Sequence, residues 1–234
     1  MYAIGHFAVG YLIGKGSSKL LKTKISLPLV LMASILPDID LLLQQINEGV
    51  FMHRGATHSI ITMTVLMIPF FVYYRKKAIP YYAVLLSHSL IGDLLTGGME
   101  MLWPLSNAWF VALDLSVNGI INVSAELTLF FISLAIMYKA KDLQTLMQPN
   151  HQNYALIIAG GAALGPLLST NGGFESMLPL PLVFPSVFWI ALFVYSLYIQ
   201  VRFDVRKHLL GGVPEKPAIK GAGRQKRIFS RNRH

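Results

Sequence analysis

The sequence predicts an all-α polytopic membrane protein, a helical bundle of six or seven transmembrane segments. Two observations lead to this fold class. Of the 234 residues, 54% are hydrophobic and only 13% are charged, whereas about a quarter of the residues of a soluble domain carry a charge. The apolar residues also form long runs, and about 20 of them make one helical crossing. The composition therefore excludes an ordinary water-soluble enzyme, and it excludes a disordered chain, which would be polar.

Seven apolar stretches are separated by polar segments or by Gly and Pro. The first and third are short for a complete crossing, so we expect them to be tilted, buried or only partly inserted. This is why the expected number of crossings is six or seven. The stretches cover residues 2–14, 25–43, 59–74, 78–95, 118–138, 154–170 and 182–201.

The positions of Lys and Arg predict which way the chain crosses. With a cytoplasmic C-terminus, only one basic residue, Arg54, falls in an outer loop. Cytoplasmic loops carry such an excess of positive charge. The inner segments hold four, three, two and ten basic residues, in residues 15–24, 75–77, 139–153 and 202–234, respectively.

Two regions follow from this pattern, a transmembrane domain over residues 1–201 and a disordered basic tail over residues 202–234. Membrane lipids are the expected partners, and the tail is expected to bind anionic headgroups at the cytoplasmic surface. We do not expect it to bind nucleic acid, because few aromatic residues lie among its charges and it has no recognisable nucleic-acid-binding fold.

Seven His and Asp residues fall near the outer ends of the predicted spans, although the charge-based topology made no use of them. A carboxylate near the hydrocarbon is costly unless it is paired with a cation. The chain has no Cys, so a metal would be bound by imidazole and carboxylate groups. We therefore predict one or two divalent ions, zinc or manganese, at the extracytoplasmic face. The candidate ligands are His6, Asp38, Asp40, His53, His58, His88 and Asp93.

Local spacing constrains these ligands. Pro37 disfavours helix at the residue before it, so we expect the chain to kink or unwind where Asp38 and Asp40 follow. Such a segment could turn both carboxylates toward one ion. His88 and Asp93 are five residues apart, a poor shared face in a regular helix, unless the helix distorts at Gly92.

Arg54 and Glu126 are the candidate catalytic residues. Arg54 could grip an anionic group such as a phosphate, or it could pair with Asp38, Asp40 or Glu48, and both alternatives remain open. Glu126 lies inside the stretch 118–138, where an ionisable residue is a functional candidate. It is a candidate general base, or else a protonated, hydrogen-bonded carboxyl.

Several motifs resemble those of a known family. Residues 53–59 read HRGATHS and residues 36–40 read LPDID. These resemble the HRGxTHS and LPDID motifs of the YdjM-like family, and His6, the His88–Thr96 run and Leu102-Trp103-Pro104 match its other landmarks in order. Its members are bacterial and archaeal integral membrane proteins described as metal-dependent hydrolases. The resemblance implies this activity in a prokaryotic cell membrane. The family pattern places the Asp four residues after the His, whereas here the spacing is five.

The leading functional hypothesis is a membrane-bound, metal-dependent hydrolase acting on a phosphoester or a lipid-linked substrate. A cation transporter and a non-catalytic scaffold that uses the basic tail are the alternatives. A transporter needs ionisable groups through the full depth of the bilayer, and the inner halves of the predicted spans carry almost none. A scaffold would leave the His and Asp set without a purpose.

Overall fold

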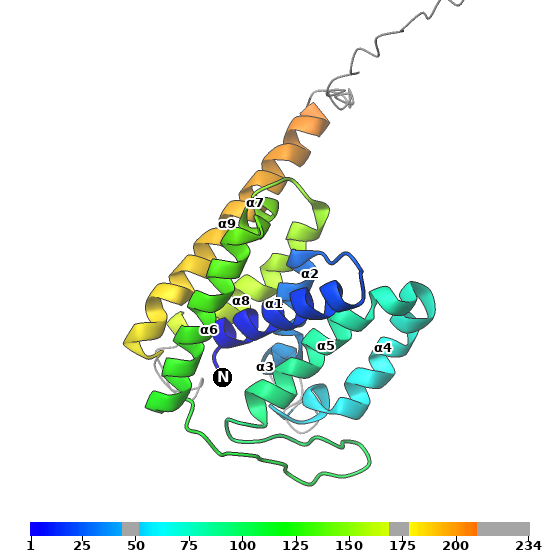
Figure 1. Ribbon diagram of the computed structural model, residues 1–234, viewed down its shortest axis with the longest axis vertical. Coiled ribbons are helices and arrows are strands. Elements are labelled where there is room, and N and C mark those ends of the chain that lie inside the picture. Colours follow the sequence, from blue (N-terminus) through cyan, green and yellow to red (C-terminus); the bar gives the residue numbers. More distant parts are fainter. Residues whose placement is uncertain (44–51, 169–177, 210–234) are drawn as a thin grey trace, which may run out of the picture.

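The computed structural model describes residues 1–43, 52–168 and 178–209 (Figure 1). These residues are helical apart from turns, loops and one isolated antiparallel bridge between Met99 and Phe110. The all-α prediction is confirmed. The α-helices are α1 (Ala3–Leu20), α2 (Leu27–Ala33), α3 (Asp40–Leu43), α4 (Ile60–Tyr74), α5 (Ile79–Ser87), α6 (Ile120–Lys139), α7 (Asp142–Leu146), α8 (Leu156–Leu168) and α9 (Leu180–Leu209).

Five short helical segments of other types connect them. Four are 3-10 helices and one, η4, is a π-helix. They are η1 (Leu36–Ile39), η2 (Ala56–His58), η3 (Arg75–Lys77), η4 (His88–Asp93) and η5 (His151–Ala155).

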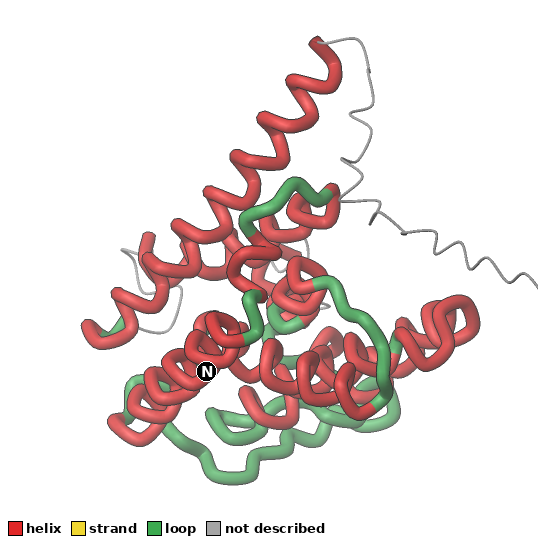
Figure 2. Tube along the Cα trace, turned by 45° about the horizontal axis from the view of Figure 1, so that its top comes forward, coloured by secondary structure: helices red, strands yellow, loops and turns green. Residues whose placement is uncertain are grey.

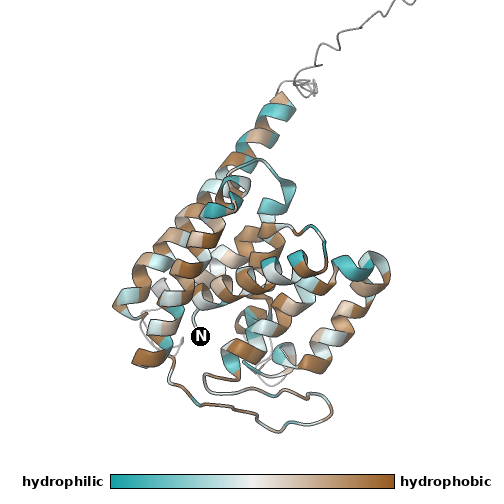
Figure 3. Cartoon of the chain, in the orientation of Figure 1, coloured by the Kyte–Doolittle hydropathy of each residue, from teal (hydrophilic) through white to brown (hydrophobic). Residues whose placement is uncertain are grey.

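Within the described residues, two helices are long and apolar enough to cross a membrane, namely α6 and α9. They lie side by side, and α9 extends past the end of α6 (Figure 1). At 1.5 Å per residue, the 20 residues of α6 span about 30 Å, close to the thickness of the hydrocarbon core. Hydrophobic residues follow both helices, and hydrophilic ones gather toward the C-terminal end of α9 (Figure 3). The predicted basic tail is described only as far as Leu209, and the rest lies outside the described residues.

Helix α1 is the centre of the molecule and makes its most extensive contacts with α5 and α6. Its aromatic side chains anchor the core, because Phe7 packs edge-on against Trp189 and Phe193 of α9, with ring centroids 5.6 and 5.3 Å apart. All three rings are buried, and edge-to-face contacts of this kind add to the free energy gained from burying their area. The core therefore fixes α1, and with it His6, against the two long helices.

The predicted stretch 25–43 is not one helix. Its regular part, α2, has seven residues, and 3-10 helix η1 follows with Pro37 near its start. Pro37 restricts the residue before it and cannot donate a backbone hydrogen bond. The expected unwinding at Asp38 is therefore present, and the chain turns there instead of continuing outward.

The predicted distortion near Gly92 is also present. Residues 88–93 form the π-helix η4, and the amide of Leu94 donates to the carbonyl of Ser89, five residues back, at 2.9 Å. A π-turn accommodates one more residue than an α-turn, and such turns occur frequently at functional sites. The wider turn brings His88 and Asp93 to one side of the helix, which their spacing would not do in a regular α-helix.

Candidate metal centre

Four side-chain atoms from three short segments converge at one point. They are Oδ1 of Asp38 in η1, Nε2 of His58 in η2, and Nε2 of His88 and Oδ2 of Asp93 in η4. The two Nε2 atoms are 3.2 Å apart. Oδ1 of Asp38 lies 3.3 and 3.2 Å from them, and Oδ2 of Asp93 lies 3.3 Å from each.

These five separations have the size expected between neighbouring ligands of a single zinc ion. Zinc binds imidazole nitrogen at about 2.0 Å and carboxylate oxygen at a similar distance. The edges of a regular tetrahedron are about 1.6 times its centre-to-corner distance, which makes them about 3.3 Å for such ligands. Moreover, Oδ2 of Asp93 is buried, and within the described residues its polar contacts are these two imidazole nitrogens. The donor set thus fits a divalent metal in both chemistry and spacing.

The opposite ring nitrogens of both histidines are engaged outside this cluster. Nδ1 of His88 lies 2.8 Å from the carbonyl oxygen of Ser34. A carbonyl oxygen only accepts, so the neutral ring carries its proton on Nδ1 and turns the lone pair of Nε2 inward. Nδ1 of His58 lies 3.1 Å from Oδ2 of Asp40. Partners of this kind fix the orientation of a metal-binding imidazole.

Asp40 is fully buried and binds four groups. Its carboxylate accepts from the backbone amide of Arg54 at 3.1 Å and from the hydroxyl of Thr57 at 2.9 Å. It also lies 3.0 Å from Nδ1 of His53 and 3.1 Å from Nδ1 of His58. These four contacts hold the 53–58 segment in place.

The charges around His58 favour its protonated form in the metal-free protein. Burial alone lowers the pKa of His58, but the Asp93 charge and the hydrogen bonds to Asp38 and Asp40 raise it to about 9. His58 lies in η2, outside the two long helices. In the metal-free protein, this proton neutralises part of the negative charge of the surrounding carboxylates. A divalent ion would take over that role and displace the proton.

Arg54 pairs with an acid that the sequence did not suggest. Its Nε lies 3.3 Å from Oδ1 of Asp93, and its Nη1 donates to the carbonyl of Thr96 at 2.6 Å. The predicted alternative of a salt bridge is thus realised with Asp93 instead of Asp38 or Asp40, while Glu48 lies outside the described residues. The backbone φ of Arg54 is 65°, a left-handed conformation that a non-glycine residue adopts only where its surroundings hold it.

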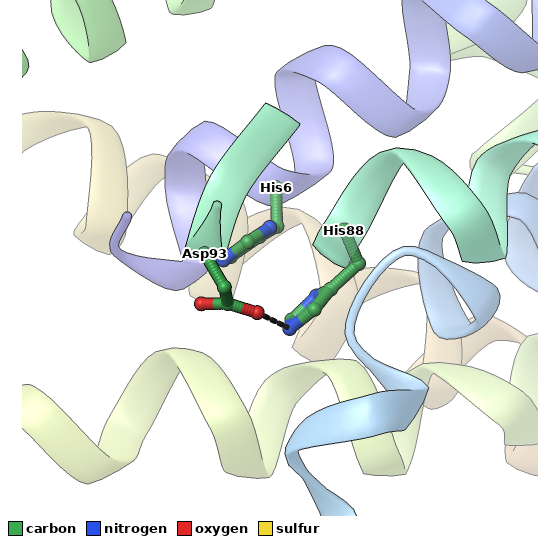
Figure 4. Close-up of side chains that lie close together, drawn as sticks. All are labelled: His6, His88 and Asp93. Atoms are coloured by element: carbon green, nitrogen blue, oxygen red, sulfur yellow. Dashed lines mark ion pairs between the residues drawn. The ribbon is translucent and has the colours of Figure 1, made fainter. Parts of the chain in front are cut away.

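His6 and His53 flank the four converging atoms. The His6 ring stacks on the ring of His88, with centroids 3.8 Å apart and an angle of 13° between the planes. Figure 4 shows His6 coming from α1 and the carboxylate of Asp93 turned toward the His88 ring. Two groups of three residues could hold an ion, His6 with His88 and Asp93, and Asp38 with His53 and His58. The structure therefore brings six of the seven predicted ligands into two adjoining groups, and Asp40 supports them.

Glu126 belongs to neither of the two groups that could hold an ion. It is fully buried in α6, and Oε1 accepts from the backbone amide of Tyr2 at 2.9 Å and from the side chain of Asn122 at 2.8 Å. It therefore accepts a hydrogen bond from the backbone at the start of α1, where the helix dipole favours a negative charge. These contacts fit the hydrogen-bonded alternative, and its role as a general base stays a prediction.

Two supporting groups were not among the predicted site residues. The carbonyls of Ser34 and Thr96 position His88 and Arg54, respectively. Backbone carbonyls occur at every residue and leave no signal in the sequence. Only the packing of α2 beside η4 could reveal the contact made by Ser34.

The structure and the buried polar cluster define a class, an all-helical membrane protein with a His and Asp centre at one end of its bundle. The sequence profile of the YdjM inner membrane protein family matches residues 1–202, and the chain belongs to this family. The family name indicates the inner membrane of a prokaryotic cell. No curated protein and no solved structure matches the chain closely enough to add a relative or a structural neighbour.

Proposed function

We propose that this protein is a membrane-bound, metal-dependent hydrolase whose centre is formed by Asp38, His58, His88 and Asp93. The observation that supports the proposal is the set of five separations of 3.2–3.3 Å among their four inward-facing atoms. Uncompensated carboxylates and imidazoles rarely gather in an apolar bundle, because burying charge is costly without a partner. A divalent ion supplies that partner.

Each residue has a distinct part in this proposal. Asp40 and the carbonyl of Ser34 orient the two imidazoles, and Arg54 holds Asp93. The side chain of Asp38 is 18% exposed, whereas those of His58, His88 and Asp93 are at most 3% exposed. Substrate and water would therefore approach from the side of Asp38. A divalent ion at such a site supplies Lewis-acid chemistry for hydrolysis.

The donor set favours one zinc ion. Two nitrogens and two oxygens suit zinc, whereas manganese prefers more oxygen ligands in an octahedron. In this arrangement neither His6 nor His53 binds the ion. His6 stacks on the ring of His88, and His53 is a partner of Asp40. A second ion would instead use His53 directly, so the number of bound ions separates the two arrangements.

The membrane arrangement is part of the proposal. The apolar helices of residues 1–201 lie in the membrane, with the basic tail from residue 202 in the cytoplasm and the metal centre near the opposite surface. The charge distribution supports this orientation, since nineteen of the twenty Lys and Arg residues fall in the inner segments. Helices α6 and α9 supply two of the crossings.

The metal content of the detergent-purified protein tests the centre. We expect about one zinc per chain by mass spectrometry, retained in the His53→Ala variant and lost from His58→Ala and His88→Ala. The matched control is His151→Ala, whose side chain is 73% exposed and whose replacement should leave the zinc in place. A folded wild type that binds no divalent ion after reconstitution would overturn the proposal.

Hydrolysis is measured separately with bis(4-nitrophenyl) phosphate and with phospholipid vesicles. We expect turnover that a chelator abolishes and that the His58→Ala variant lacks. Metal binding without hydrolysis of either substrate would leave a structural metal centre and contradict the enzymatic part of the proposal.

A further inference from the structure

The loop between η4 and α6 exposes apolar side chains beside the metal centre. It runs along one end of the bundle (Figure 2), and hydrophobic residues recur along it (Figure 3). Leu105 is 81% exposed and Leu113 is 63% exposed. Other exposed members are Leu102, Trp109 and Val111. Large apolar side chains exposed together mark a surface that contacts a partner or a membrane.

The loop is held in place by its own hydrogen bonds. Met99 and Phe110 exchange two backbone hydrogen bonds of 2.9 Å. The amide of Ala112 donates to the carbonyl of Leu94 at 2.7 Å, and the indole of Trp109 donates to the carbonyl of Gly97 at 2.8 Å. Because the backbone is fixed in this way, the outward direction of these side chains is a property of the fold.

The same loop is joined directly to the residues around the metal centre. The amide of Glu100 donates to the carbonyl of Arg54 at 2.9 Å. The hydroxyl oxygen of Ser59, directly after His58, lies 3.1 and 2.6 Å from the carbonyl oxygens of Met101 and Trp103, the second being the closer acceptor of its one hydrogen. The apolar surface and the metal-binding segment are therefore parts of one rigid unit.

The apolar surface continues into the lipid-facing surface of α6. Ile120 and Ile121 begin this helix directly after the loop and are 78% and 65% exposed. No Lys or Arg occurs between Lys77 and Lys139, and the exposed acids of the loop are limited to Asp114 among the described residues. Trp side chains, like those here, favour the boundary between lipid and water.

We infer that this loop is a lipid-binding platform that lies in the headgroup layer and presents a membrane lipid to the metal centre. The continuity with α6 favours a bilayer surface over a protein partner, because lipid already covers the neighbouring exposed residues of that helix. The identity of the substrate as a lipid headgroup ester or phosphoester rests on the proposed hydrolase function. The contact of the loop with lipid is independent of that function.

The absence of Cys permits a direct depth measurement. A spin label on Leu105→Cys, in vesicles of phosphatidylethanolamine and phosphatidylglycerol, should collide more often with oxygen, which concentrates in lipid, than with a water-soluble nickel chelate. Gln144→Cys, on the exposed surface of α7, is the aqueous control and should show the reverse. A Leu105 label with the same nickel accessibility as the control would overturn the inference.

A second variant tests the substrate class. Leu105→Asp with Leu113→Asp should reduce hydrolysis of phospholipid vesicles at least tenfold, while bis(4-nitrophenyl) phosphate is hydrolysed at the wild-type rate and the zinc content is unchanged. Equal rates on vesicles would contradict lipid presentation by the loop. If the wild type hydrolyses neither compound, the hydrolase proposal fails and the spin-label result still decides whether the loop contacts lipid.

Discussion

Asp40 illustrates how one buried residue can organise a candidate site without touching the proposed metal position. Its carboxylate joins His53, Thr57 and His58 to the backbone of Arg54. We expect Asp40→Asn to weaken zinc binding about 10–100-fold, the usual effect of losing a carboxylate partner of a metal-binding His. The amide keeps the volume of the carboxylate but loses the charge and one acceptor. Zinc affinity is measured by competition with a chromogenic chelator.

Asp114→Asn is the matched control for this change. Asp114 is exposed and its backbone φ is 48°, a conformation that Asn tolerates. Its replacement should leave zinc affinity unchanged. Equal affinities of the Asp40 variant and the control would show that His58 is oriented without Asp40.

At the scale of elements, the site depends on the close approach of α1 to the π-helix η4. A Cβ atom built on Gly92 would collide with the imidazole of His6. Gly92→Ala should therefore separate the two helices or displace the His6 ring from His88, with a cost of about 1–3 kcal/mol for overpacking. We expect a lower melting temperature in detergent and weaker zinc binding.

Gly161→Ala, in α8, separates the steric effect from helix propensity. A Cβ atom at Gly161 would meet nothing within 4 Å, and Ala is the better helix former. The melting temperature of this variant should be equal to that of the wild type or higher. A Gly92 variant as stable as this control would mean that the approach of α1 to η4 is not tightly packed.

At the scale of the whole molecule, the orientation of the bundle can be tested with the same cysteine-free chain. The basic residues predict that the loop after η4 and the α7 region face opposite sides of the membrane. In spheroplasts, a membrane-impermeant maleimide should label Asn107→Cys and should label Gln144→Cys only after lysis. The reverse pattern would place the metal centre on the cytoplasmic side.

The sequence alone predicted the helical class and most of the apolar helices, because hydrophobic runs and charge asymmetry are local properties. It also predicted the candidate ligands, because His and Asp in apolar surroundings need a reason to be there. The sequence predicted one apolar stretch over residues 25–43, whereas only seven of these residues form α2 and a 3-10 helix follows at Pro37. Hydropathy does not distinguish the two, because the residues on both sides of the break are apolar.

Tertiary structure decided how these candidate ligands meet. The sequence contained the five-residue spacing of His88 and Asp93, but only the π-helix η4 turns both toward Asp38 and His58. Likewise, Arg54 had several candidate acids, and the fold selected Asp93. The physical reason is the distance along the chain over which each effect acts. Hydropathy and helix-breaking residues act within a few positions, whereas the separations of 3.2–3.3 Å between candidate ligand atoms arise from packing between segments up to 50 residues apart, from Asp38 to His88.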